Sequence, residues 1–177
     1  IGHPDDFVFD VIDEVLTEGV TSRLYSTLLR DRRLAASVLS DTNYPGVRAP
    51  NLFVIAATPL APHSVTEVET AIYEELDRLK TEPISAKEFE RVLNGLDADL
   101  VRSLRSNSGL ASQLAFYQTV AGTWRYVLNA RDRIAAVTPA DVQRVAAQYL
   151  TKPNRTVGVL VKKAQDKKMA AAGEVAR

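Results

Sequence analysis

The sequence has no cysteine, only two histidines, and one methionine among its 177 residues. The lack of cysteine excludes disulfide bonds, thiolate metal ligands and cysteine nucleophiles. No apolar run approaches the roughly 20 residues that a membrane-spanning helix needs, so we expect no membrane span. Basic and acidic side chains balance at 22 each. A chain without a basic excess is not typical of a nucleic-acid-binding surface, so we expect no nucleic-acid partner.

What the sequence does have is the composition of an ordinary globular domain, 46% hydrophobic and 25% charged. It begins at Ile1 and its methionine is Met169, so we expect a processed chain or a piece of a longer protein. The length suits a single domain, which we place at residues 1–161, followed by a polar, alanine-rich tail at 162–177. The composition leaves both the cytoplasm and the periplasm of a bacterium open as compartments.

Seven segments show helical spacing of apolar residues or helix-start signals. Ser64 with Glu67, and Ser85 with Glu88, have the spacing of capping boxes, and Thr138 with Asp141 has the same spacing. Thr21 or Ser22 could cap the second segment. In the fifth, the spacing predicts that Leu110, Leu114, Tyr117 and Ala121 share one face. The predicted helices cover residues 5–16, 22–32, 64–82, 85–105, 110–121, 124–137 and 138–150.

Three segments read as strands. Val38, Ser40, Thr42 and Tyr44 fall on alternate positions of residues 34–44, which is typical of a strand. The apolar run at 51–58 predicts a buried strand that pairs back on it antiparallel, and 156–161 predicts a last strand. The fold class is therefore α+β, with a mainly antiparallel sheet packed on one side by helices. Three strands are few for such a sheet, so we expect a strand ahead of Ile1 to be truncated.

The stretch Gly19-Val20-Thr21-Ser22-Arg23-Leu24-Tyr25, followed by Leu34-Ala35-Ala36-Ser37-Val38, resembles a known signature. It is similar to the "GG-x-SSRLY … LAYSV" pattern of the pitrilysin (insulinase) zinc metallopeptidase family. The signature belongs to the non-metal-binding, C-terminal half of that family. The resemblance extends over residues 4–161 and implies half of the pitrilysin-type α+β fold.

The residues that zinc peptidase chemistry needs are missing from the sequence. The family's zinc motif is H-x-x-E-H, but His3 and His63 lie sixty positions apart, each beside a proline. No Gly-x-Ser-x-Gly nucleophile motif occurs either. We therefore expect no catalytic residue, metal ligand or cofactor in this chain. The resemblance implies zinc in a companion, either an N-terminal domain of the same protein or a partner subunit.

The non-metal half of the family often supplies an Arg–Tyr pair that contacts the peptide substrate. On that alignment Leu29 stands at the arginine position and Ala36 at the tyrosine position. Arg30 is one residue away from the arginine position. Candidate substrate-binding residues are Arg30, Ala36 and Ser37. We interpret Arg23 as structural, joining its helix to the sheet.

Three functions remain open at this point. The chain could form the chamber wall opposite the zinc-bearing half of a metalloendopeptidase and offer strand 35–44 to a peptide substrate. It could be an inactive, structural subunit of a processing-peptidase-like complex. It could also be an unrelated helical protein-interaction module, which a structure without a sheet would favour.

Overall fold

The computed structural model describes residues 1–161. The predicted polar tail at 162–177 lies outside the described residues. The described chain contains six α-helices, one π-helix, a short 3-10 turn and two strands. In order they are α1 (Asp6–Leu16), η1 (Tyr25–Asp31), β1 (Ala35–Tyr44), β2 (Leu52–Pro59), α2 (Val65–Thr81), α3 (Ala86–Leu104), α4 (Asn107–Val120), α5 (Tyr126–Ala135), α6 (Pro139–Tyr149) and η2 (Lys152–Asn154).

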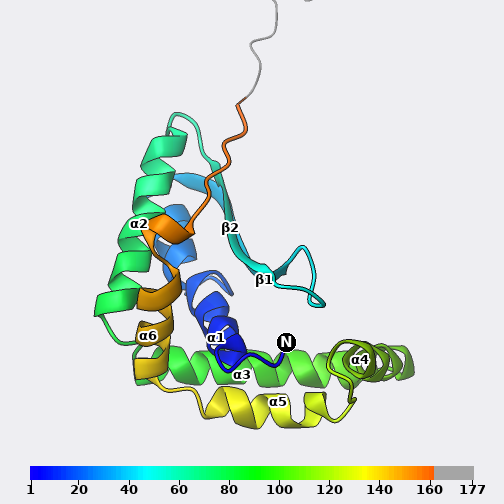
Figure 1. Cartoon of the computed structure of the whole chain (residues 1–177). Coiled ribbons are helices and arrows are strands. Elements are labelled where there is room, and N and C mark those ends of the chain that lie inside the picture. Colours follow the sequence, from blue (N-terminus) through cyan, green and yellow to red (C-terminus); the bar gives the residue numbers. More distant parts are fainter. Residues whose placement is uncertain (162–177) are drawn as a thin grey trace, which may run out of the picture.

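The molecule has two arms that meet at α1 (Figure 1). One arm holds α2 and α6 side by side, with the β1–β2 hairpin along its inner side. The other arm holds α3 and α5, with α4 at its far end. Helix α1 packs against α3, α5, α6 and β1. It therefore lies between the two arms and carries much of the core.

Helix α1 is buried because its apolar residues recur at helical spacing. Val11, Ile12, Val15 and Leu16 have no exposed surface. Polar side chains fix its two ends. Buried Asp5, just before the helix, accepts hydrogen bonds from Arg144 (2.7 Å) and Tyr149 (3.0 Å) of α6. At the other end, the Thr17 hydroxyl lies 2.6 Å from that of Ser40 in β1.

The sheet confirms the α+β prediction. Strands β1 and β2 pair antiparallel, with Leu39 opposite Ala56 and Asp41 opposite Val54. One face, which includes Val38 and Ile55, packs on the helical core. The other face is open, and Leu39 is 54% exposed there. The prediction that the second strand is buried was therefore wrong, because helices cover only one face of the hairpin.

The three predicted capping boxes are present at the starts of α2, α3 and α6. The predicted cap of the second helix by Thr21 or Ser22 is absent. The Ser22 hydroxyl instead donates to the carbonyl of Gly19 at 2.8 Å, and the helix that follows, η1, is a π-helix without a side-chain cap. Helix α4 begins earlier than predicted, capped by Ser106. It has no fully buried residue, although Leu114, Tyr117 and Ala121 of the predicted shared face are half-buried.

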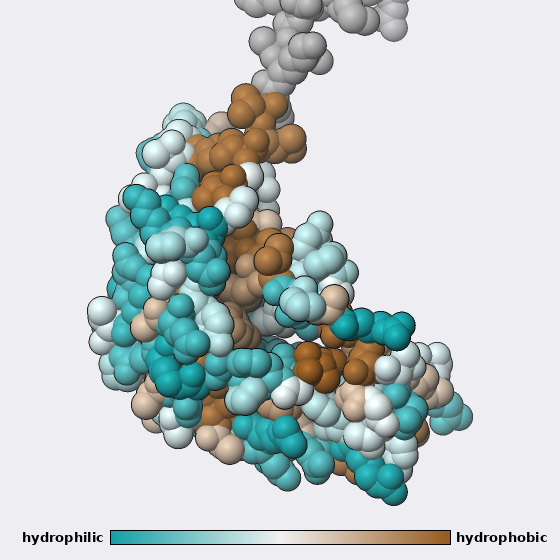
Figure 2. Space-filling view, in the orientation of Figure 1, coloured by the Kyte–Doolittle hydropathy of each residue, from teal (hydrophilic) through white to brown (hydrophobic). Residues whose placement is uncertain are grey.

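The predicted third strand is also absent from the described chain. Residues 156–161 follow η2 without regular secondary structure, and Leu160 is 97% exposed. A strand needs a neighbour to accept and donate its main-chain hydrogen bonds. Among the described residues β1 and β2 pair only with each other, so this apolar segment has no partner strand. Figure 2 shows it as an exposed apolar stretch at the top of the molecule.

The junction between η1 and β1 holds Arg33 in the left-handed conformation, with φ of 51°. The N–H of Leu34 reaches back to the carbonyl of Leu28 at 2.7 Å, as in helix ends that normally use glycine. A side chain at this φ costs about 1–2 kcal/mol. The sequence pattern gave no sign of this strain.

Replacing Arg33 with glycine should therefore raise the free energy of unfolding by about 0.5–1 kcal/mol, since glycine relieves the strain but loosens the unfolded chain. Urea denaturation measures the change. Arg32→Gly is the matched control, because Arg32 has a right-handed φ of −96°. That variant should be less stable than the parent. Equal effects of the two substitutions would contradict the prediction.

Candidate functional site

The predicted peptide-binding strand begins with an irregularity. Ala35 lies opposite Pro59 and Ser37 opposite Thr58, so Ala36 is an extra residue in β1. Both Ala36 and Ser37 are exposed. Such bulges often re-aim side chains beside binding sites. Two of the three predicted site residues therefore lie together on an accessible part of the sheet.

One edge of β1 is open in the described chain, since β1 pairs with β2 alone. An open strand edge presents unpaired main-chain N–H and C=O groups, to which an extended peptide can hydrogen-bond. Leu39 of β1 lies on the exposed face of the same hairpin.

The third predicted residue, Arg30, lies at the end of η1 and not on the strand. Its guanidinium forms a paired contact with the carboxylate of Asp31, with 2.7 Å from Nε to Oδ1. Its side chain is 57% exposed. Among residues 1–161, the hydrogen bonds and ion pair of the Arg30 side chain go to Asp31, and none goes to Ala36 or Ser37. Arg30 is thus an accessible cation near the start of β1, held by its sequence neighbour.

Arg23 has the structural role expected of it, but with a different partner. It joins the residues before η1 to α3 and not to the sheet. Its Nε donates to Oε1 of Glu88 at 2.7 Å, and its Nη2 to Oε2 at 3.3 Å. Glu88 also accepts from the Ser85 N–H at the start of α3. Burial by itself raises the pKa of Glu88, but the hydrogen bonds from Arg23 and Ser85 outweigh it and hold that pKa at about 2.

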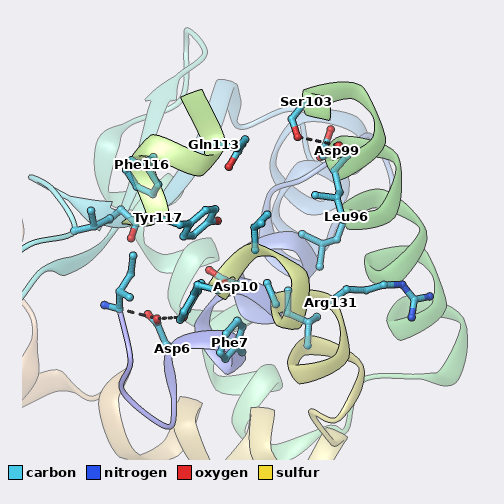
Figure 3. A pocket seen from close by; sticks show the side chains of 18 of the residues that line it. Asp6, Phe7, Asp10, Leu96, Asp99, Ser103, Gln113, Phe116, Tyr117 and Arg131 are labelled. Carbon is cyan, nitrogen blue, oxygen red and sulfur yellow. Dashed lines mark hydrogen bonds and ion pairs between the residues drawn. The ribbon is translucent and has the colours of Figure 1, made fainter. Parts of the chain in front are cut away.

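The inner corner of the molecule contains a cavity of about 410 Å³. Figure 3 shows Asp6, Phe7 and Asp10 of α1 on one side of it, with Phe116 and Tyr117 of α4 close by. Other lining residues come from α3 (Leu96 and Asp99), α5 (Tyr126 and Arg131) and the end of β1 (Asn43). Four helices and the hairpin thus meet around one hollow.

A row of stacked rings forms one wall of this cavity. Phe7 stacks on Tyr126 with ring centroids 5.7 Å apart, and Tyr126 stacks on Tyr117 at 5.3 Å. Phe116 meets Tyr117 edge-on at 5.2 Å. The Tyr126 hydroxyl donates to Asp6 at 3.3 Å. The faces and hydroxyls of these rings therefore lie close to the carboxylates of α1.

Asp10 is the least compensated charge in the cavity. Burial raises its pKa to about 7, and Asp6 and Asp13 add to the shift, against a hydrogen bond from Thr42. Burial likewise raises the pKa of Tyr117, with further contributions from Asp10 and Asp6. No lysine or arginine acts on Asp10 in the described part of the chain.

Comparison with known families decides the relationship that the signature suggests. A model of the peptidase M16 inactive domain matches residues 1–96 of the chain, more than half of its 177 residues. The chain belongs to the peptidase M16 inactive-domain family. The resemblance seen in the sequence is thereby confirmed.

Two relatives of this M16 inactive domain are zinc proteases by name. An uncharacterized zinc protease of Streptomyces coelicolor is 30% identical over 140 residues, which are 79% of this chain and 30% of that protein. Zinc protease PqqE of Helicobacter pylori is 26% identical over 83% of this chain and 32% of its own length. The chain thus spans about a third of the curated relatives that it matches.

A solved structure agrees with this assignment. The inactive peptidase domain of a presumed zinc protease of Bordetella parapertussis superposes with a TM-score of 0.78 at 25% identity. The match covers 93% of this chain and 88% of that one. The α+β architecture described above is therefore that of M16 inactive domains.

Zinc does not fit the residues of this M16 inactive domain. Within residues 1–161, no three His, Cys, Asp or Glu side chains are grouped so as to hold a metal ion. His3 accepts a hydrogen bond from the Asp5 N–H at 3.1 Å, and His63 lies 3.3 Å from Glu67. Each histidine therefore has a local role in a loop or helix start.

No helix within residues 1–161 combines the length and the apolar character that crossing a bilayer demands.

The cavity is the feature that the sequence pattern missed. The polar face of α1 predicts Asp6 and Asp10 in solvent, yet both line the hollow. Tyr126 follows Asp6 by 120 positions and reaches it only through the packing of α5 on α1. The one local signal is that Asp6 and Asp10 are four residues apart, which places them on the same helix face.

Proposed function

We propose that this M16 inactive domain is the non-catalytic half of a zinc metalloendopeptidase. In this role it forms the chamber wall opposite the zinc-bearing half and binds part of the peptide substrate. The observation that carries the proposal is the open edge of β1, with Ala36 and Ser37 exposed beside it. Zinc would reside in the companion half, whether an N-terminal domain or a partner subunit.

The proposal includes a further strand from residues ahead of Ile1, with residues 1–161 otherwise forming a single domain. Two strands alone bury little, and Leu52 of β2 is 61% exposed. An added strand would extend the sheet and give the apolar segment at 156–161 a neighbour. The small share of the relatives that this chain spans is consistent with such a contribution.

A structural subunit of a processing-peptidase-like complex is the second candidate. Leu29 and Ala36 stand where the family pattern has its Arg–Tyr pair, so this domain would grip a substrate less firmly than an active relative. A purely helical interaction module is disfavoured, because β1 and β2 form a sheet.

Reconstitution tests the proposal. The 177-residue chain is mixed with the H-x-x-E-H-bearing half, and cleavage of an unstructured peptide lacking lysine and arginine is followed. We expect cleavage by the mixture only, with zinc found in the companion. Association without cleavage would favour the structural subunit. Stoichiometric zinc in the chain by itself would overturn the proposal.

Arg30→Ala should raise the KM of the reconstituted enzyme about 3- to 5-fold while leaving folding unchanged, because exposed ion pairs contribute at most about 1 kcal/mol. Asp31→Ala is the matched control: it breaks the same ion pair but keeps the guanidinium. Steady-state kinetics compares the two. If both variants, or neither, raise KM, Arg30 does not bind substrate.

A further inference from the structure

We propose that the aromatic-lined cavity between α1, α4 and α5 binds the cationic side chain of a lysine or arginine in a peptide. The inference rests on the proposed function, since it names which part of a peptide this domain would recognise. The strand edge would hold the peptide main chain, and the cavity would select a side chain.

The first support is the shape and lining of the cavity. Its volume of about 410 Å³ exceeds what a water molecule needs. Tyr117 and Tyr126 stack along one wall, and Phe116 is 43% exposed at its rim. Aromatic faces attract ammonium and guanidinium groups within about 6 Å of the ring centroid. The same walls can cover the aliphatic stem of a long side chain.

The second support is the charge balance. Asp6 and Asp10 both line the cavity. Arg131, the cationic side chain among the lining residues, forms a paired contact with Asp97, 2.6 Å from Nε to Oδ1. It therefore leaves Asp10 without a countercharge in the described part. A partly buried carboxylate of this kind is stabilised by any cation that enters.

Binding of two matched peptides to the 177-residue chain tests the proposal. The probes are acetyl-Gly-Lys-Gly-amide and the same peptide with norleucine, which keeps the aliphatic stem and removes the charge. Titration at pH 8, where Asp10 is mostly ionised, is followed by NMR through the signals of Tyr117 and Tyr126. We expect the lysine peptide to bind with a Kd of about 1 mM or above. We expect the norleucine peptide to bind about 5- to 30-fold more weakly.

Asp10→Asn should lower the affinity for the lysine peptide to that for the norleucine peptide. Asp132→Asn is the control, since Asp132 is an exposed carboxyl on α5 outside the cavity lining. It should leave the affinity within about 2-fold, as expected for an exposed charge. The proposal is overturned if the two peptides bind alike, if neither binds at tens of millimolar, or if both variants weaken binding equally.

Failure of this test is distinguishable from failure of the proposed function. The titration uses the chain without its companion and without catalysis, whereas the reconstitution uses a peptide free of lysine and arginine. A chain that completes the enzyme but does not prefer the lysine peptide would refute the cavity assignment alone.

Discussion

Replacing Arg23 with alanine should lower the free energy of unfolding at pH 7 by about 2–3 kcal/mol. Removing one partner of a buried ion pair typically costs about 3–5 kcal/mol, and we expect less because the Glu88 side chain is 27% exposed. The loss includes the first turn of α3, where Glu88 also accepts from Ser85. Urea denaturation of the two proteins at pH 7 measures the difference.

The effect of Arg23→Ala should depend on pH in a defined direction. The pKa of Glu88 is held at about 2 in the folded chain, against about 4.3 when unfolded. The ion pair therefore stabilises the fold fully above pH 4.3, and this stabilisation is lost as pH falls toward 2. The parent and the variant should converge over that range. A gap that stays constant down to pH 2 would contradict the assigned role.

Arg30→Ala is the matched control for this prediction, because both arginines lie in the same short segment. Arg30 is exposed and pairs with its sequence neighbour. Its loss should leave the urea denaturation midpoint nearly unchanged at any pH, because exposed ion pairs contribute little to stability. Comparable losses for Arg23→Ala and Arg30→Ala would show that the burial of Arg23 has no energetic consequence.

The double variant Asp10→Asn/Glu14→Gln should be more stable than the parent by about 2–4 kcal/mol at pH 8. A pKa shift of one unit corresponds to about 1.36 kcal/mol, and we take about half of that value for each carboxyl because both are partly exposed. Burial and neighbouring carboxylates raise both pKa values to about 7. For Glu14 these neighbours are Glu18, Asp99 and Asp13, and Arg91 acts in the opposite direction. The amides remove the charge while keeping the shape.

The sign follows from the raised values. A carboxyl that binds its proton more tightly when folded stabilises the fold below its unfolded pKa of about 4, and that stabilisation is lost as pH rises toward 7. The parent should therefore lose stability between about pH 4 and 7, and the double variant should lose less. Denaturation at several pH values measures both curves. Equal pH dependence of the two proteins would show that these carboxyls are effectively solvated.

The same substitution of Asp10 separates an effect on binding in the cavity from an effect on stability. Asp10→Asn should stabilise the chain and at the same time weaken the binding of the lysine peptide. Loss of binding could then not be ascribed to unfolding.

Much of the secondary structure could be predicted because its signals are local. The capping boxes at Ser64, Ser85 and Thr138 join residues three positions apart, and all three are present. The alternation in residues 34–44 placed β1 to within a residue. Where prediction failed, the deciding contact was distant. Residues 156–161 have the composition of a strand, but no neighbouring strand pairs with them in the described part of the chain.

The candidate site could likewise be predicted only where its signals are local. Ala36 and Ser37 could be placed on an accessible strand from the sequence. The partner of Arg23 lies 65 positions away and could not be foreseen. The cavity depends on packing between α1, α4 and α5, so no pattern within any one helix shows that Asp6 and Asp10 face aromatic rings.

The sequence by itself determined where most helices begin, the antiparallel pairing of β1 and β2, the M16 signature, and the lack of an H-x-x-E-H zinc motif. These depend on residue identity and on hydrogen bonds that span a few positions. The tertiary structure alone decided which charges are buried and which strand edge stays open. Burial and strand pairing are properties of neighbours, and those neighbours come from parts of the chain that only folding brings together.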